Sequence, residues 1–551
     1  MNRHIGAILR RFIFILFLGS LGVGGISSSA LAKGESDPMK SFLKSRNSLE
    51  LVESCLILQE TGPVRAYGDY LREKGKDELL NRVRFLEELY AGNNAGALQA
   101  LDLMKKKDAW SKSRAAYLNG LMEIQRSFAE TKSDHFVVRV ASEDAFLSAY
   151  ALPSLETAYS RVGEFFGSSP TVPSVIEIYP TVDAFSAAST RPKAAVEKTG
   201  EVTAFMFGRI MVLSPGATAF GYRWLDGMVH AYVQQNVNRL SGGRCPAWLQ
   251  EGGARYLEVA WRRPDGFAHT PSELTLLTRA VLADTGTPVG LLSFDSLESA
   301  FANFASNEQR TLALAEATDA VDYIVQEFGV EKVRILLQSF REKSRADAFQ
   351  DVLGMSESDF EKSWRASLAD LTEVPVDLAR GALGETVSFG ERDDLRLVDE
   401  EVRSKIDLGD QLLQKNQMEG AVVEYKKAIE QEPDNGVALT RLARAYVTGH
   451  KIQSAEELLK RAMEKNPDYA SPYIVMGGIY FDDGRYEEAQ QVLQQALEIN
   501  PFQSKIHEIL GLIAVDVGNF VLAKQSLELA LRFDPANDAV RQSIEHMPKP
   551  R

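Results

Sequence analysis

The sequence predicts an α+β domain placed between an N-terminal helical region and a C-terminal all-α solenoid. From about residue 46 to residue 130, apolar residues recur every three or four positions, which is the periodicity of helices packed on one face. At His135–Val140 the period changes to two, which indicates a strand with one buried face. Beyond residue 400 a 34-residue repeat dominates, and repeats of this length form stacked helix pairs.

Composition limits the possible roles of the chain. Its 551 residues leave room for three or four domains of ~150 residues each. The net charge is −14, and residues 1–32 contain three arginines but no acidic residue, so the rest of the chain is more acidic still. This balance argues against nucleic acid as a partner.

The first 32 residues have the three parts of a secretory signal peptide. Arg10 and Arg11 precede the short apolar run Phe12–Val23, and Ala30-Leu31-Ala32 is a small-x-small cleavage site. A membrane-spanning helix needs ~20 apolar residues, more than this run provides. We therefore expect cleavage before Lys33, no transmembrane segment in the mature chain, and export to the periplasm or out of the cell. An uncleaved anchor is the alternative.

Residues 33–130 are expected to be helical, with Leu80, Val83 and Leu86 among the positions at helical spacing. The part from Tyr90 to Gly120 fits either a degenerate tetratricopeptide helix pair or an ordinary helical hairpin, and the sequence does not separate the two.

The chain has two cysteines, Cys55 and Cys245. They could pair in an oxidising compartment, or Cys55 could be a plain core residue in its apolar surroundings. The sequence leaves the pairing open, and we favour two unpaired thiols.

Residues 131–373 are expected to form the α+β domain. Four segments are expected to be strands: His135–Val140, which alternates, and the short segments Val175–Tyr179, Val202–Phe205 and Arg209–Leu213. The last two would turn around Gly208. An amphipathic helix is expected at Leu155–Phe166, and residues 271–370 are mostly helical. Residues 374–401 lose the helical pattern and gather glycine, proline and charge, so we assign them to a linker.

The strongest periodic signal lies in residues 402–537, where four repeats agree in register. Prolines mark the period at Pro433, Pro467, Pro501 and Pro535. Small residues occupy three further registers: Gly409, Ala443, Gly477 and Gly511; Ala421, Ala455, Ala489 and Ala523; Ala428, Ala462, Ala496 and Ala530. The larger residues expected between the helices of each pair are Tyr425, Leu459, Leu493 and Leu527.

This is the period of tetratricopeptide repeats (TPR), so we expect each repeat to be a pair of helices that cross closely at the small residues. Stacked pairs form a curved array with a concave face suited to extended peptides or partner helices. We therefore expect protein or peptide partners at this array. The alternatives are that it dimerises or only caps the preceding domain. Residues 538–551 are expected to be a tail.

The stretch Trp224–Glu258 carries the candidate functional residues. It is expected to form two helices joined by a glycine-containing loop. Asp226 and His230 are four residues apart on the first helix, so they share one face, and Glu251 opens the second helix.

The second helix reads P-x-W-L-x-E-G-x-A, at Pro246, Trp248, Leu249, Glu251, Gly252 and Ala254. With the Asp226–His230 pair before it, this stretch resembles the peptidase MA family of gluzincin-type metallopeptidases. The resemblance covers roughly residues 131–370. The other segments that carry it are Leu155-Glu156, Tyr159, Phe166-Gly167, Val175–Tyr179, Phe185, Arg209–Pro215, Ala315–Gly329 and Gly354–Trp364.

The resemblance implies a gluzincin fold, in which an edge strand lines the cleft, and a zinc site built on HExxH and a later glutamate. In that pattern Asp226 takes the position of the first histidine ligand, His230 the second and Glu251 the third, while Gly227 takes that of the general base. Glycine cannot accept the proton that amide hydrolysis by metal-bound water releases. We therefore expect no catalytic residue and a vestigial metal set of Asp226, His230 and Glu251.

The function we expect is that of an exported, non-catalytic scaffold or adaptor: a pseudopeptidase joined to a protein-binding array, without a bound cofactor. The alternative is a zinc-dependent metallopeptidase with an altered active site, in which Asp226, His230 and Glu251 hold the metal. Glu258 is expected either beside the ligand set or on the surface, and Arg255 is a candidate partner of Asp226. The sequence does not predict the substrate-binding residues, the partner or the oligomeric state.

Overall fold

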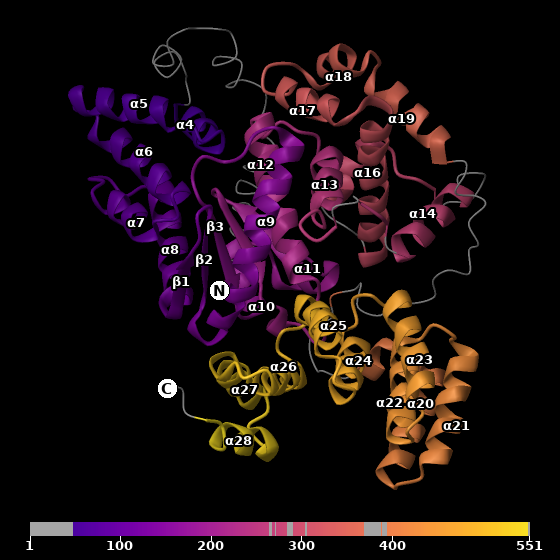
Figure 1. The fold of residues 1–551 in the computed structure, drawn as a ribbon. Helices are drawn as coiled ribbons and strands as arrows, with labels where there is room; N and C mark the ends of the chain where they lie inside the picture. Colours follow the sequence, from indigo (N-terminus) through magenta and orange to yellow (C-terminus); the bar gives the residue numbers. More distant parts are fainter. Residues whose placement is uncertain are drawn as a thin grey trace, which may run out of the picture.

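The computed structural model describes residues 48–263, 267–269, 271–283, 290–302, 306–368, 387, 389 and 394–548 (Figure 1). The expected signal peptide, residues 33–47 and most of the expected linker lie outside these ranges. Within them, none of the helices combines the length and the apolar composition that crossing a bilayer requires. A helical group, a domain built on one sheet and a helical array follow one another, as the sequence predicts.

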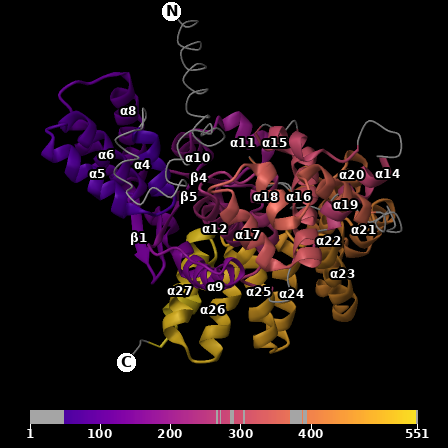
Figure 2. The same cartoon turned by 90° about the horizontal axis from the view of Figure 1, so that it is seen from above.

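The described N-terminal region folds into helices α4 (Ser48–Ile57), α5 (Thr61–Glu73), α6 (Asp77–Tyr90), α7 (Asn94–Asp102) and α8 (Ala109–Ile124). Their buried side chains form an apolar cluster that includes Leu80, Val83 and Leu86, so the predicted helical period is confirmed. The helical region ends before residue 130, because strand β1 begins at Phe128. Figure 2 shows these N-terminal helices and the C-terminal array against different sides of the central domain.

The central domain is built on a five-stranded sheet with the order β1-β2-β3-β5-β4. The strands are β1 (Phe128–Lys132), β2 (Phe136–Ala141), β3 (Ser174–Tyr179), β4 (Thr203–Met206) and β5 (Arg209–Leu213). Strands β2, β3 and β5 are parallel, and β1 and β4 run antiparallel at the two edges. The four predicted strands are confirmed. The sequence does not predict β1, because this mostly exposed edge strand lacks an apolar alternation.

The tip of the β4–β5 hairpin reaches the N-terminal helices. Its residues Phe207 and Gly208 have φ angles of 52° and 73°, and the first of these is a strained value for an aromatic residue. The Phe207 ring packs against Tyr90 and Tyr117, with centroid separations of 6.2 and 6.1 Å. The N-terminal helices therefore hold the hairpin that contains edge strand β4.

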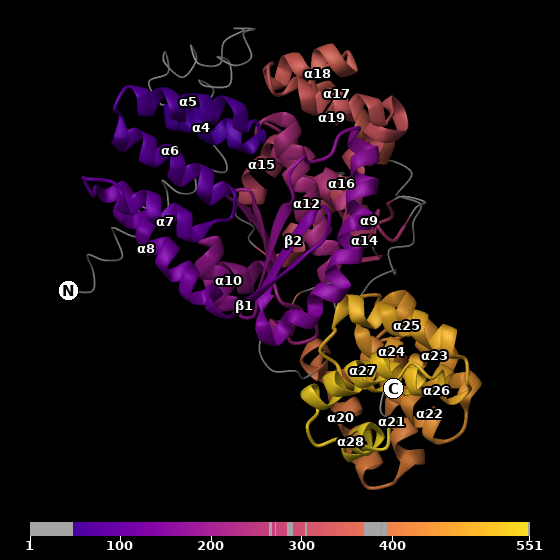
Figure 3. The same cartoon turned by 60° about the vertical axis from the view of Figure 1, so that its left-hand side comes forward.

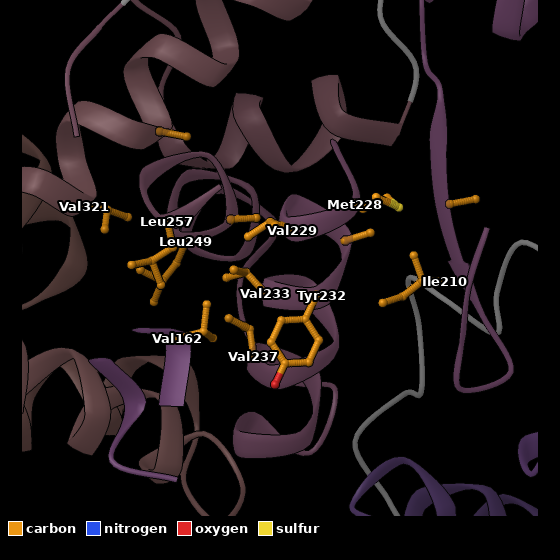
Figure 4. Close-up of a cluster of buried hydrophobic side chains, with 14 of the residues drawn as sticks. Val162, Ile210, Met228, Val229, Tyr232, Val233, Val237, Leu249, Leu257 and Val321 are labelled. Atoms are coloured by element: carbon orange, nitrogen blue, oxygen red, sulfur yellow. The ribbon is translucent and has the colours of Figure 1, made fainter. Parts of the chain in front are cut away.

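Helices α12 (Trp224–Ser241) and α13 (Ala247–Leu257) lie in the middle of the domain's apolar core. In Figure 4, Val229 and Val233 of α12 face Leu249 and Leu257 of α13, while Ile210 of β5 lies on the other side of α12. Because neighbours cover α12 on both sides, nearly all of its residues are buried.

The other described helices of this domain surround α12 and α13. They are α9 (Ser148–Phe166), α10 (Val182–Ser189), α11 (Lys193–Thr199), α14 (Pro271–Ala283), α15 (Phe294–Ala302), α16 (Asn307–Phe328), α17 (Val330–Ser339), α18 (Arg345–Leu353) and α19 (Glu357–Ser367). The helical character predicted for residues 271–370 is thus confirmed where the chain is described. Helix α9 begins at Ser148 rather than at the predicted Leu155.

The repeats fold as consecutive helix pairs, which Figure 3 shows as an array beside the central domain. The pairs are α20 (Glu400–Gln414) with α21 (Met418–Gln431), α22 (Gly436–Thr448) with α23 (Ile452–Lys465), α24 (Ala470–Asp482) with α25 (Tyr486–Ile499), and α26 (Ser504–Asp516) with α27 (Phe520–Phe533). The predicted repeat register therefore corresponds to one helix pair in each period.

The small residues lie where the two helices of a pair cross, as predicted. A Cβ atom added to Gly477 would lie 2.6 Å from the Leu493 side chain, and one added to Gly511 would lie 2.7 Å from that of Leu527. Such distances are too short for a carbon–carbon contact. The glycines therefore allow each large residue to fill the space between its two helices.

Both ends of the array differ from prediction. Residues 394–401, which the sequence assigns to the linker, already pack on the repeats: Asp394 accepts hydrogen bonds from Arg441 at 3.0 Å and Tyr469 at 2.6 Å. The expected tail contains helix α28 (Asp538–Glu545), whose Val540 is buried in one cluster with Leu527. A short end helix of this kind covers the apolar face of the last repeat.

The two cysteines are not bonded to each other. Cys55 is buried in α4, and Cys245 is half-buried just before α13, and both are free. This agrees with the interpretation of two unpaired thiols.

Candidate functional site

Close packing of α13 sets the position of Glu251. A Cβ atom added to Gly252 would lie 2.2 Å from the carbonyl oxygen of Ala317 in α16, so only glycine allows the two helices to approach this closely. Gly252, which follows Glu251 in the sequence pattern, is therefore a packing residue. With α13 held in this way, the preceding Glu251 faces His230 on α12.

His230 lies between two carboxylates. Its Nε2 atom is 3.3 Å from Glu251 Oε2, and its Nδ1 atom is 2.9 Å from Glu258 Oε2. Burial alone would lower the pKa of His230, but the hydrogen bonds and charges of the two glutamates outweigh it and raise the pKa to about 9. At neutral pH the ring is therefore a cation that donates from both nitrogens.

Glu251 is the anionic member of this pair. Burial raises its pKa, but the hydrogen bond from His230 and the charges of His230, Arg310 and Arg191 bring it below the ordinary value. Gln234 donates a further hydrogen bond to its second oxygen at 2.8 Å. Both Glu251 oxygens are thus engaged by protein groups.

Asp226 belongs to a different set of contacts. It accepts hydrogen bonds from Trp261 Nε1 at 2.9 Å and from Arg262 Nε and Nη2 at 3.0 and 2.5 Å. The structure therefore brings His230 and Glu251 together as the sequence suggests, and turns the Asp226 carboxylate to Arg262. Arg255, the partner considered for Asp226, instead pairs with Glu258 and Glu273, each at 2.8 Å.

The charges around His230 continue as an alternating chain. Its members, each in contact with the next, are Glu251, His230, Glu258, Arg255, Glu273, His269 and Asp319. Burying charge is costly unless each group is paired, and alternation of sign satisfies this condition. Of these residues the sequence offers no signal for Glu273, His269 and Asp319. The available signal is the spacing of Glu251, Arg255 and Glu258, which are four and three residues apart along α13 and its C-cap.

The position of the general base is packed by its neighbours. A Cβ atom added to Gly227 would lie 3.3 Å from the Thr203 methyl group of edge strand β4 and 3.6 Å from the Tyr222 ring. A side chain at residue 227 would therefore need β4 to yield slightly. Gly227 itself contributes no acid or base.

Comparison with known families separates the chain into two parts. The model of the Peptidase MA superfamily matches residues 155–370, and that of the Tetratricopeptide repeat protein 21 C-terminal ARM domain matches residues 398–540. The central part is a peptidase MA superfamily domain. The C-terminal part is a TPR-type helical repeat domain. No curated protein matches the chain.

Three solved structures each resemble about a quarter of this chain. PilF of Pseudomonas aeruginosa is 30% identical, covering 26% of this chain and 67% of its own, with a TM-score of 0.25. MamA is 27% identical, covering 25% of this chain and 81% of its own, with a TM-score of 0.23. TTC0263, a TPR protein of Thermus thermophilus, is 25% identical, covering 26% of this chain and 79% of its own, with a TM-score of 0.24.

A peptidase MA domain implies a zinc site at Asp226, His230 and Glu251, but these side chains, as they are arranged, do not fit the ion. A zinc ligand must be a neutral imidazole, so binding would first remove a proton from His230, at a cost of ~3 kcal/mol at pH 7 for a pKa of about 9. It would also break the hydrogen bonds that Asp226 makes with Trp261 and Arg262. In the described part of the chain, no three His, Cys, Asp or Glu side chains are grouped to hold a metal.

Proposed function

We propose that this protein is an exported, non-catalytic scaffold, in which a degenerate peptidase MA domain supports a TPR array that binds protein partners. The observation that carries the proposal is the position of His230, which is bonded between Glu251 and Glu258, in a site where a glycine takes the position of the general base. Both histidine nitrogens are already engaged by carboxylates, and Gly227 offers no base to activate water at its position.

The repeats support the choice of partner. TPR-type arrays generally bind proteins or peptides on surfaces formed by several repeats. In this array the exposed apolar residues include Leu408, Val521 and Leu522, which are 44%, 61% and 46% exposed. The export of the protein rests on residues 1–32, which lie outside the described chain, and sequencing the N-terminus of the protein from its source cells tests it. A mature chain that begins at Lys33 supports export.

The absence of catalysis can be tested with the mature full-length chain. We expect no cleavage of an unfolded protein substrate, with or without added zinc. Cleavage that a chelator abolishes would establish instead a zinc-dependent metallopeptidase with an altered site.

The scaffold role can be tested with a photo-crosslinking residue placed at Leu408 or Val521 of the array. Ile335 of α17, which is 40% exposed, is a matched control in the central domain. We expect the same protein to be captured from both array positions and not from the control. If the array positions capture nothing beyond the control, the array only caps the domain or joins copies of the chain.

A further inference from the structure

The repeat domain docks on the segment that leads into the site helix α12. The backbone N–H of Tyr222 donates to the Ile499 carbonyl at 2.9 Å, and the Trp224 indole N–H donates to the Leu497 carbonyl at 3.0 Å. Trp224 is completely buried. The last turn of α25 therefore holds the first residue of the helix that contains Asp226, Gly227 and His230.

Two glycines on the domain side make this approach possible. Gly221 has a φ angle of +82°, and a Cβ atom there would lie 2.3 Å from the Ile499 carbonyl oxygen. A Cβ atom on Gly216 would lie 2.8 Å from the Phe502 ring. Glycine at these two positions therefore allows the segment before α12 to pack closely against the repeats.

A cluster of charges lies at the same junction. Arg223 Nε is 2.5 Å from Asp468 Oδ1, and Arg223 Nη1 is 3.6 Å from Glu498 Oε2; both acidic residues belong to the repeats. Burial raises the pKa of Glu498; Asp226 raises it further, and the charges of Arg262 and Arg223 act to lower it. Arg223 precedes the first residue of α12 and is followed three residues later by Asp226, so the Asp226–Arg262 pair lies one helical turn from this cluster.

We propose that Asp226 is an interdomain docking residue: its carboxylate holds Arg262 one helical turn from the Arg223–Asp468–Glu498 cluster and balances the two arginines there, so the position that the peptidase pattern gives to the first zinc ligand serves the contact with the repeats. An aspartate suits this role, because its two oxygens accept from both Nε and Nη2 of Arg262. A histidine could not neutralise Arg262 next to Arg223. Residue 226 therefore cannot serve as a metal ligand and as the partner of Arg262 at the same time. The inference stands whether or not the array binds a partner.

Hydrogen–deuterium exchange on the mature full-length chain tests this inference at the Tyr222 amide and across residues 495–503. Asp226→Asn and Arg262→Gln should each raise the exchange rate there roughly tenfold. Without the buried charge pair, local opening of the interface costs less free energy. Asp226→His, which restores the ligand type of the peptidase pattern, should do the same. The double variant Asp226→Asn, Arg262→Gln should add little to either single one, because both remove one interaction.

Two further variants make the result decisive. Gly221→Ala should open the interface by steric clash and shows that the method detects undocking. Arg334→Gln is the matched control: this arginine is 29% exposed against 22% for Arg262, and it bonds α17 to the Phe165 carbonyl. It should leave the interface amides unchanged. The proposal is overturned if Gly221→Ala raises exchange while both Asp226→Asn and Arg262→Gln match the unmodified protein.

Discussion

The Nδ1 atom of His230 lies 2.9 Å from Oε2 of Glu258. Glu258 is a residue of the α13 end, and its carboxylate is also bonded to Arg255, so it joins the histidine to the rest of the charge chain. Together with the contact from Glu251, this contact outweighs burial and raises the pKa of the ring, so that the histidine has a structural role in the domain.

Removing this partner should destabilise the peptidase MA domain. Glu258→Gln removes the carboxylate that His230 and Arg255 share, and loss of one member of a buried charge pair costs ~3 kcal/mol. Chemical denaturation followed by tryptophan fluorescence should show the loss. A variant as stable as the unmodified protein would mean that the glutamate does not hold the histidine.

Neighbouring glycines in α13 should respond in opposite ways to alanine. Gly252→Ala places a Cβ atom 2.2 Å from the Ala317 oxygen and should cost ~3 kcal/mol in free energy of unfolding, as overpacking does. Gly253→Ala meets no atom of the described residues within 4 Å and should stabilise the helix by ~0.5–1 kcal/mol. Equal effects in thermal unfolding would contradict the close approach of α13 and α16.

The repeat array offers a second matched pair. Gly477→Ala should cost ~1–3 kcal/mol, because its Cβ atom would lie 2.6 Å from Leu493. The next residue is open: a Cβ atom on Gly478 comes no nearer than 3.9 Å to Ile509, so Gly478→Ala should be neutral or slightly stabilising. Circular dichroism melting of both variants tests the register, and a destabilised Gly478→Ala beside an unaffected Gly477→Ala would show that the register is wrong.

Both thiols should be unreactive in the folded protein. Burial, with a smaller contribution from Glu60, raises the pKa of Cys55 to about 12, and burial also raises that of Cys245. The reactive thiolate is therefore scarce at pH 8, and alkylation should be at least roughly tenfold slower than after unfolding. Mass spectrometry of the alkylated protein measures the rates. A Cys55–Cys245 disulfide in the native protein would contradict the structure.

The features that the sequence predicts best are local or periodic. The 34-residue register predicts Gly477 against Leu493, because each repeat encodes its own helix crossing. Strand β2 is predictable from its alternation, and β3 and β5 from short apolar runs that mark buried strands. The resemblance to the peptidase MA pattern, rather than a local period, predicts that His230 and Glu251 lie together.

The features that the sequence did not predict depend on distant residues. Asp226 turns to Arg262, which is 36 positions away and follows α13 in a turn of no regular period. The docking of Leu497 on Trp224 spans 273 positions, and no local pattern encodes a contact of that separation. Glu273 and Asp319 are likewise far along the sequence from His230, so no local pattern predicts that they belong to the same chain of charges.

The most direct test of the central claim is the metal content and turnover of the purified mature protein, measured beside the double variant Asp226→His, Gly227→Glu. We predict that the unmodified protein carries no stoichiometric zinc and cleaves no unfolded substrate, and that the variant gains zinc. About one zinc per chain in the unmodified protein, together with proteolysis that a chelator stops, would contradict the account and make Asp226, His230 and Glu251 a working metal site.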